Sequence, residues 1–211
     1  MKVTSYSAGK TGDFAFTDEN LARAKALLAR YPEDRKASAV IGLLDLAQRQ
    51  NEGWLPREAI EYVADILGMA PIRVHEVATF YTMFNLQPVG RHFIQVCRTT
   101  PCWLRGAGDL TRTCRDKLGV GLRQVTEDGQ FSVVEVECLG ACANAPMVQI
   151  NDDYYEDLTP ERMAEIIDEL RAGKEVAPGP QVARTGSAPL GGPTTLKEDP
   201  ARAPAEPGGS R

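Results

Sequence analysis

The sequence has little of what several large classes of protein need. Its 24 basic residues are fewer than its 29 acidic ones, which gives a net charge of −5, whereas a nucleic-acid-binding chain would need a basic face. No apolar run approaches the roughly 20 residues that span a bilayer. The two histidines, His75 and His92, stand alone and belong to no ligand pattern, so we expect structural or solvated roles for both.

The first 20 residues also lack the apolar segment of a secretory signal and the arginine-rich, acid-poor composition of a transit peptide. They contain Asp13, Asp18 and Glu19 instead. We therefore expect a cytoplasmic, bacterial chain. In a reducing compartment, paired cysteines are more often metal ligands or redox thiols than structural disulfides.

The N-terminal part of the chain has the signals of helices. After an irregular arm over residues 1–16, Thr17 is a good N-cap, and Pro56 and Pro71 suit the first turns of two later helices. Apolar residues recur at helical spacing through four segments of this part. Residues 17–88 are therefore predicted to form a helical bundle.

The sequence pattern changes from helical to strand-like at His92. The expected elements are a strand over 92–97, a helix over 104–118, a hairpin of 123–125 with 131–136, a strand over 147–150 and a helix over 159–173. The order β-α-β-β-β-α over residues 89–176 predicts an open α/β sandwich, and a thioredoxin-like sheet fits that order. The whole chain is thus expected to be α+β or α/β.

The last segment, residues 177–211, has a different composition. It holds seven of the fourteen prolines and only isolated valines and leucines. Such a segment buries too little apolar surface to offset the entropy of ordering it, so the sequence predicts a disordered C-terminal tail.

Four of the five cysteines form two pairs, Cys97 with Cys102 and Cys138 with Cys142. Four residues separate the first pair and three the second, so neither is the Cys-x-x-Cys typical of zinc ribbons and thiol redox enzymes. Two wider pairs at strand ends suit a [2Fe–2S] cluster, in which each iron takes two thiolates. Structural zinc and thiol redox chemistry remain as alternatives.

Such a cluster is an anion, because four thiolates, two sulfides and two ferric ions sum to a charge of −2. It needs main-chain N–H groups close to its sulfurs. Gly140, Ala141 and Ala143 are small enough to allow that approach. Arg98, beside the first pair, is expected either to balance part of the charge or to be solvated.

Several other residues have simpler interpretations. Cys114, in a helix, is expected to be a small buried filler. The tyrosines of Asp152-Asp153-Tyr154-Tyr155 are expected to lie in a tight turn, with a partner-facing patch as the alternative. Phe80, Tyr81, Met83 and Phe84 are expected to be core between the two domains. Gly106-Ala107-Gly108 lacks the third glycine of a dinucleotide fingerprint.

Longer strings around these residues resemble one family. They are Phe80 to Gly90, Cys97 to Gly106, Cys138 to Pro146 and Asn151 to Thr159. Together they resemble the 24 kDa subunit of NADH:quinone oxidoreductase, respiratory complex I, over about residues 15–175.

The resemblance implies a thioredoxin-like [2Fe–2S] domain with Cys97, Cys102, Cys138 and Cys142 as the ligands, and no catalytic residue or NADH or flavin site of its own. It implies that the cluster exchanges single electrons with the FMN of the NADH-oxidising partner subunit. The large iron–sulfur subunit is a second expected partner, and the complex is expected on the cytoplasmic side of the inner membrane. The diaphorase module of an NAD-linked hydrogenase or formate dehydrogenase is the alternative.

Overall fold

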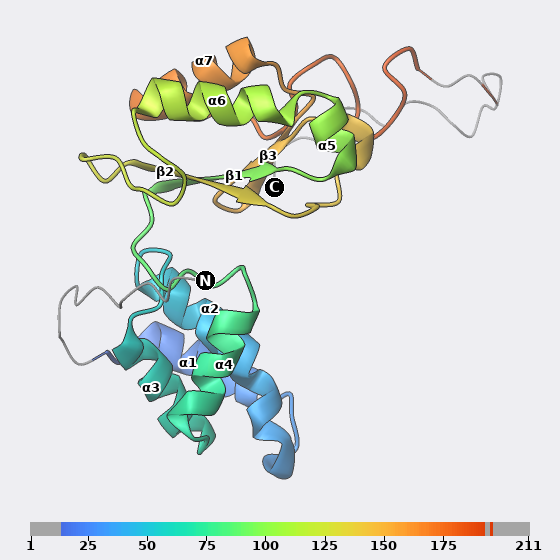
Figure 1. Ribbon diagram of the computed structural model, residues 1–211. Helices are drawn as coiled ribbons and strands as arrows, with labels where there is room; N and C mark the ends of the chain where they lie inside the picture. Colours follow the sequence, from blue (N-terminus) through green and yellow to red (C-terminus); the bar gives the residue numbers. More distant parts are fainter. Residues whose placement is uncertain (1–13, 193–194, 196–211) are drawn as a thin grey trace. The chain divides into compact units, whose positions relative to one another are not determined.

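The computed structural model describes residues 14–192 and 195 of the chain (Figure 1). The chain divides into two compact units, and the boundary along the sequence lies between Arg91 and His92. Each unit has its own apolar core. None of the helices in the described residues is both long and apolar enough to cross a membrane.

Within residues 14–91, the helical unit contains α1 (Asp18–Leu28), the 3-10 helix η1 (Glu33–Ala39), α2 (Val40–Gln50), α3 (Arg57–Leu67) and α4 (Pro71–Phe80). The sequence signals for these helices are confirmed. Thr17 Oγ1 accepts from the N–H of Asn20, Gly68 ends α3 in the left-handed conformation, and Pro71 begins α4. The core of the unit is made by Leu43, Leu44, Leu55, Ile60, Val63 and their neighbours.

The end of the N-terminal arm also packs on this unit. The rings of Phe14 and Phe16 lie edge-on to Tyr62, with centroids 5.6 and 5.3 Å away, and Phe16 is buried. Residues 14–16 have no regular secondary structure. The remainder of the predicted arm, residues 1–13, lies outside the described residues.

Of the four residues Phe80, Tyr81, Met83 and Phe84, which were expected to form core between the two domains, three do not belong to the core of the helical unit. Phe84 is buried in the helical unit, but Phe80 is 76% exposed, Met83 is half exposed and Tyr81 is exposed too. The reason is that α4 ends at Phe80 and a turn follows, in which the N–H of Phe84 bonds to the carbonyl of Tyr81. The turn directs Phe84 inward and leaves Phe80 on the surface.

The second unit is built on a five-stranded sheet in the order β2-β1-β3-β4-β5 within the described residues. Its strands are β1 (His92–Cys97), β2 (Phe131–Val136), β3 (Val148–Ile150), β4 (Asp153–Glu156) and β5 (Gly179–Pro180). β1 pairs parallel with β2 and antiparallel with β3. The helices are α5 (Thr100–Leu104), α6 (Ala107–Leu118) and α7 (Pro160–Arg171). Figure 1 shows α6 and α7 side by side over one face of the sheet. The predicted mixture of helix and sheet is confirmed.

Two details of the predicted strands are wrong. Residues 123–125 do not form a hairpin strand, since only Val125 makes an isolated bridge, to Ser132. Arg123 has a positive φ of 63°, which ends the extended conformation there. The predicted tight turn at the paired tyrosines is instead β4, which pairs with β3 after a turn at Asn151.

The predicted disordered tail is also wrong over its first residues. Gly179–Pro180 form β5 and pair with β4. The composition does not predict this contact, because the contact depends on main-chain groups and polar side chains rather than on apolar burial. Residues 193–194 and 196–211 of the predicted tail lie outside the described residues.

Candidate metal centre

The parallel pairing of two strands brings the cysteine pairs to the same end of the sheet. Cys97 is the last residue of β1 and lies opposite Val136, the last residue of β2. Because parallel strands end at the same edge, Cys138, two residues beyond β2, emerges beside Cys97. Cys102 follows in α5, and Cys142 begins the 3-10 helix η2 (Cys142–Asn144).

Cys97 and Cys102, the inner pair, are buried. The Cys97 sulfur lies 3.4 Å from Thr99 Oγ1 and accepts hydrogen bonds from the main-chain N–H groups of Thr99 and Leu139. Burial raises the pKa of Cys97, but these hydrogen bonds outweigh it and the pKa lies below its ordinary value. Burial and then the neighbouring Cys97 raise the pKa of Cys102 to about 12, against a smaller opposing hydrogen bond from the Met147 N–H.

Cys138 and Cys142, the outer pair, are exposed, and their sulfurs are 3.5 Å apart. The main-chain N–H of Gly140 and then the Cys142 thiol lower the pKa of Cys138. The hydrogen bond with Cys138 raises the pKa of Cys142. Each pair therefore has one thiol whose pKa is lowered and one whose pKa is raised and whose proton a metal would displace.

The two pairs are also close to each other. A charge on Cys97 acts on both Cys138 and Cys142, and a charge on Cys142 acts on Cys102. Among residues 14–192 and 195, no three His, Cys, Asp or Glu side chains converge as ligands of one metal ion. The thiols form two pairs, close enough for a charge in one pair to act on the other. This arrangement fits a cluster of two irons that each take two thiolates.

Main-chain N–H groups face these sulfurs from Thr99, Leu139, Gly140 and Met147. Of the small residues expected to allow such contacts, Gly140 is among the donors. Its φ is +88°, and a Cβ placed on it would meet nothing within 4 Å. Glycine is therefore required here for backbone conformation rather than for space.

The loop that carries the outer pair, residues 138–144, is attached to the sheet by a side chain that was not among the predicted site residues. The hydroxyl group of Tyr154, in β4, donates to the carbonyl oxygen of Leu139 at 2.8 Å. Asp153 to Glu156 shows no period-two alternation, and the sequence signal for a strand here is the strand propensity of two adjacent tyrosines. Tyr155 is buried on the opposite side of the strand, which disfavours the alternative of a partner-facing pair.

Arg98 does not face the thiols as the charge-balance interpretation requires, nor is it simply solvated. It forms an ion pair with Glu135, in β2. The hydroxyl group of Thr111 also donates to that carboxylate, at 3.1 Å. The charge of Arg98 is therefore largely offset by Glu135.

The remaining candidate residues have structural positions. Cys114 belongs to α6 and is fully buried in the core of the second unit, as predicted. Gly106 is the left-handed residue before α6. His92 lies at the start of β1, the end away from Cys97, with its ring 5.0 Å from that of Phe131. His75 lies on α4 in the helical unit.

Residues 24–171 match the family model of the thioredoxin-like [2Fe-2S] ferredoxins. The E subunit of the NADH-quinone oxidoreductase of Rickettsia bellii is 62% identical over 77% of this chain and 97% of its own length. An E subunit of the same kind of oxidoreductase from Rhizobium meliloti is 60% identical, over 87% of this chain and 68% of its own. The mitochondrial NADH dehydrogenase [ubiquinone] flavoprotein 2 of Dictyostelium discoideum is 50% identical, over 89% and 76%.

A solved NAD+-reducing [NiFe]-hydrogenase shares the fold, with a TM-score of 0.55 and 23% identity over 63% of this chain and 23% of that one. The predicted thioredoxin-like fold and the resemblance to the 24 kDa subunit are confirmed. The family match includes all four paired cysteines, and the chain belongs to the thioredoxin-like [2Fe-2S] ferredoxin family.

Proposed function

We propose that this chain is the electron-transfer subunit of an NADH-quinone oxidoreductase, and that Cys97, Cys102, Cys138 and Cys142 hold its one [2Fe–2S] cluster. The observation that carries the proposal is the shared end of β1 and β2, which brings two cysteine pairs together. The family and the two bacterial oxidoreductase relatives, which are about 60% identical, support the same function.

The simplest assignment gives the inner pair to one iron and the outer pair to the other. When bound, such a cluster accepts and releases one electron. The N–H groups of Thr99, Leu139, Gly140 and Met147 stabilise the negative charge on the sulfurs. Because the outer pair is exposed and the inner pair is buried, the outer pair faces the side from which a redox partner would approach.

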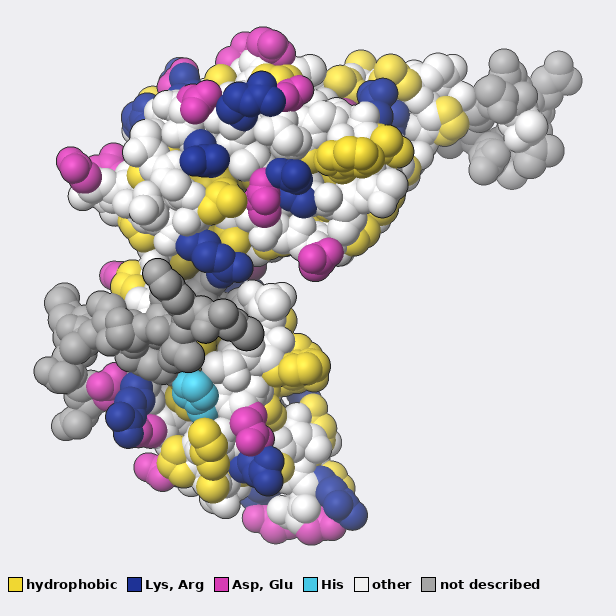
Figure 2. Space-filling view, in the orientation of Figure 1, with side chains coloured by type: hydrophobic (Ala, Val, Ile, Leu, Met, Phe, Trp, Pro, Cys, Tyr) yellow, Lys and Arg dark blue, Asp and Glu magenta, His cyan; other side chains and the backbone are white. Residues whose placement is uncertain are grey.

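The NADH and FMN sites are assigned to a partner subunit, since Gly106-Ala107-Gly108 opens α6 after the short helix α5 rather than after a strand. The proposed partners are the FMN- and NADH-binding subunit and the large iron–sulfur subunit of the peripheral arm, on the cytoplasmic side of the membrane. The helical domain over residues 17–88 would supply most of the docking surface. Apolar side chains reach the surface of this unit (Figure 2), among them Ile72, Phe80 and Met83.

The alternative of an NAD-linked hydrogenase module has weaker support, because the solved hydrogenase is alike in fold alone, at 23% identity. Co-purification separates the two. A tagged chain in its native host should bring down proton-pumping membrane subunits. Recovery of a soluble hydrogenase or formate dehydrogenase would favour the alternative.

Anaerobic reduction by NADH tests the proposed electron transfer. NADH alone should leave the visible absorbance of the purified chain unchanged. Addition of a catalytic amount of the FMN-bearing subunit should bleach it, because FMN takes a hydride and passes on one electron per cluster. Bleaching by NADH alone would contradict the absence of a flavin and NADH site here. If dithionite reduced the cluster but NADH together with the flavoprotein did not, the assigned partner would be contradicted.

A further inference from the structure

The segment after α7 returns to the sheet and pairs with its edge strand, β4. We call residues 177–187 the C-terminal strap. Gly179 and Pro180 pair with Tyr155 and Glu156 as β5, and the N–H of Gln181 donates to the carbonyl of Glu156 at 2.9 Å. The strap thus extends the sheet at the edge strand β4.

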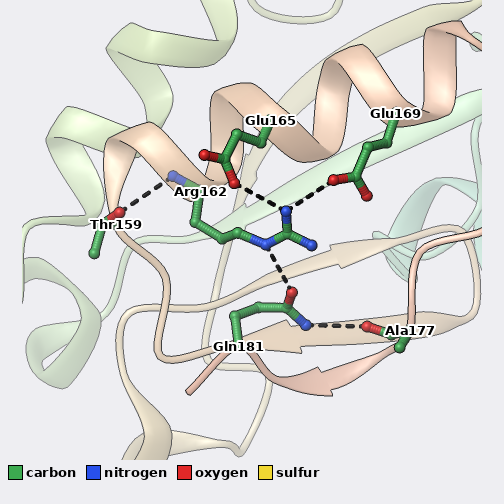
Figure 3. Close-up of polar contacts among 6 residues, drawn as sticks. All are labelled: Thr159, Arg162, Glu165, Glu169, Ala177 and Gln181. Carbon is green, nitrogen blue, oxygen red and sulfur yellow. Dashed lines mark hydrogen bonds and ion pairs between the residues drawn. The ribbon is translucent and has the colours of Figure 1, made fainter. Parts of the chain in front are cut away.

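The side chain of Gln181 locks this part of the strap to α7 (Figure 3). Its Nε2 donates to the carbonyl oxygens of Ala177 and Gly179, both at 3.0 Å. Its Oε1 accepts from Nε of Arg162 at 3.0 Å. Arg162 is itself held by two ion pairs, with Glu165 and Glu169. Residues 177–181 of the strap are therefore held in place by Gln181 and Arg162, ahead of the part of the strap that contacts the cysteine loop.

Three residues after Gln181, Arg184 contacts the end of the outer cysteine loop. Its Nη1 donates to the carbonyl oxygen of Ala143 at 3.0 Å and to Oδ1 of Asn144 at 2.6 Å. Its Nε lies 3.5 Å from Oδ2 of Asp157, and the two side chains are only 14% and 12% exposed. A mostly buried cation thus holds the two residues that follow Cys142.

Asn144 joins the strap, the loop and β4. It is buried, and its Nδ2 donates to the Glu156 carboxylate and, at 3.0 Å, to the carbonyl of Gly186. Its own carbonyl accepts from the N–H of Asp157 at 2.8 Å, and its N–H donates to Ala141 at 3.0 Å. Every polar group of Asn144 is engaged, so a shift of the strap must move the backbone next to Cys142.

We propose that Arg184 is a positioning residue for the iron–sulfur site, which fixes the outer pair through Ala143 and Asn144. The inference rests on the proposed function, because it takes Cys138 and Cys142 as cluster ligands. A planar guanidinium can hold a carbonyl, an amide and a carboxylate at once, in a fixed geometry that an ammonium group cannot reproduce. Tyr154 holds this loop near its beginning, and Arg184 holds it near its end, next to the exposed Cys142.

Loss of Arg184 has two consequences. The carbonyl of Ala143 and the carboxylate of Asp157 lose a buried partner, so the loop gains freedom and the cluster becomes more accessible to a chelator. Asp157 is then left as an unbalanced negative charge near an anionic cluster, which disfavours the added electron. The midpoint potential should therefore fall.

The test compares full-length Arg184→Gln, Arg184→Lys and Arg23→Gln with the wild-type chain, each with its cluster. Arg23→Gln removes the same charge and one ion pair, with Glu19, from the surface of α1 in the helical unit. The readouts are the rate at which EDTA bleaches the visible spectrum, the EPR spectrum of the reduced protein and the midpoint potential.

Arg184→Gln should lose its cluster several-fold faster than the wild type, with an altered EPR line shape and a lower potential. Arg184→Lys should recover the midpoint potential but not the bleaching rate, because lysine restores the positive charge but not the planar set of N–H donors of the guanidinium group. Arg23→Gln should match the wild type. Identical rates and spectra for Arg184→Gln and wild type would overturn the positioning role alone. A wild-type chain without iron would instead overturn the proposed function.

A second pair of variants covers the case in which Arg184→Gln does not fold. A chain that ends at Gly192 keeps the strap, and one that ends at Val176 lacks it. The first should bleach at the wild-type rate and the second faster. Equal rates in the two would overturn the inference.

Discussion

The hydroxyl group of Tyr154 donates a hydrogen bond to the main-chain carbonyl of Leu139, at 2.8 Å. Leu139 directly follows Cys138, the first cysteine of the outer pair, and Tyr154 belongs to β4. The loop that carries the exposed cysteines is thus fixed to the sheet near its beginning by a tyrosine and near its end by Arg184. Both contacts come from residues beyond the cysteine motif itself.

Tyr154→Phe should remove that hydrogen bond and leave the ring in place. We expect a loss of about 0.5–1.5 kcal/mol in the free energy of unfolding, together with faster release of the cluster to EDTA. The matched control is Tyr155→Phe, whose hydroxyl group donates to the carbonyl of Val176 at 3.3 Å. It should cost similar stability but release the cluster at the wild-type rate. Equal release rates in the two variants would show that the Leu139 contact does not hold the loop.

Gly140→Ala should weaken the site through the backbone. A residue with a side chain at φ +88° is disfavoured by about 1–2 kcal/mol, and the shift needed to relieve it would move an N–H that faces the Cys138 sulfur. We expect lower iron content and a shifted EPR spectrum. Gly108→Ala is the control, because Gly108 lies in α6 without a positive φ or a close neighbour. It should keep the spectrum and gain about 0.5 kcal/mol of stability. A wild-type spectrum in Gly140→Ala would refute this role.

The fifth cysteine, Cys114, is a control for the four proposed ligands, because it is a buried thiol outside the two pairs. Cys114→Ala should keep the full visible spectrum at a stability loss of about 1 kcal/mol, whereas Cys138→Ala should lose most of it. Burial raises the pKa of Cys114 to about 12, so at neutral pH it stays protonated and should not react with iodoacetamide in the folded chain. The checks are absorbance, iron content and mass spectrometry of the alkylated protein. An intact spectrum in Cys138→Ala would exclude that cysteine as a ligand.

Two phenylalanines near the end of α4 should respond differently to truncation. Phe84 is buried in the helical unit, so Phe84→Ala should cost about 3–5 kcal/mol in chemical denaturation. Phe80 is exposed, and Phe80→Ala should change stability by no more than about 0.5 kcal/mol. If Phe80→Ala proved as destabilising as Phe84→Ala, the exposed position of Phe80 would be wrong.

Local sequence rules predicted several helix starts and the strand that ends at Cys97. Thr17 and Pro71 mark helix starts by capping chemistry that depends on neighbouring residues alone. The strand that ends at Cys97 is likewise marked by residues within its own short segment. Each of these signals is complete within a few residues of the chain, so no knowledge of the tertiary structure was needed.

Contacts between distant segments were not predictable in the same way. The bond from Tyr154 to Leu139 spans 15 residues, and that from Arg184 to Ala143 spans 41. Composition classed residues 177–187 as a disordered tail because they bury little apolar surface. The main-chain N–H of Gln181 nevertheless bonds to Glu156 of β4, and Arg184 bonds to Asn144 of the outer cysteine loop. Exposure of Phe80 likewise depends on where α4 stops rather than on residue type.

The central claim is that the four paired cysteines hold one two-iron cluster. The most direct test is the iron, zinc and acid-labile sulfide content of the purified full-length chain, with an EPR spectrum after reduction by dithionite. We expect a brown protein with about two irons and two sulfides per chain and the signal of one unpaired electron. One zinc per chain, without iron or sulfide, would contradict it.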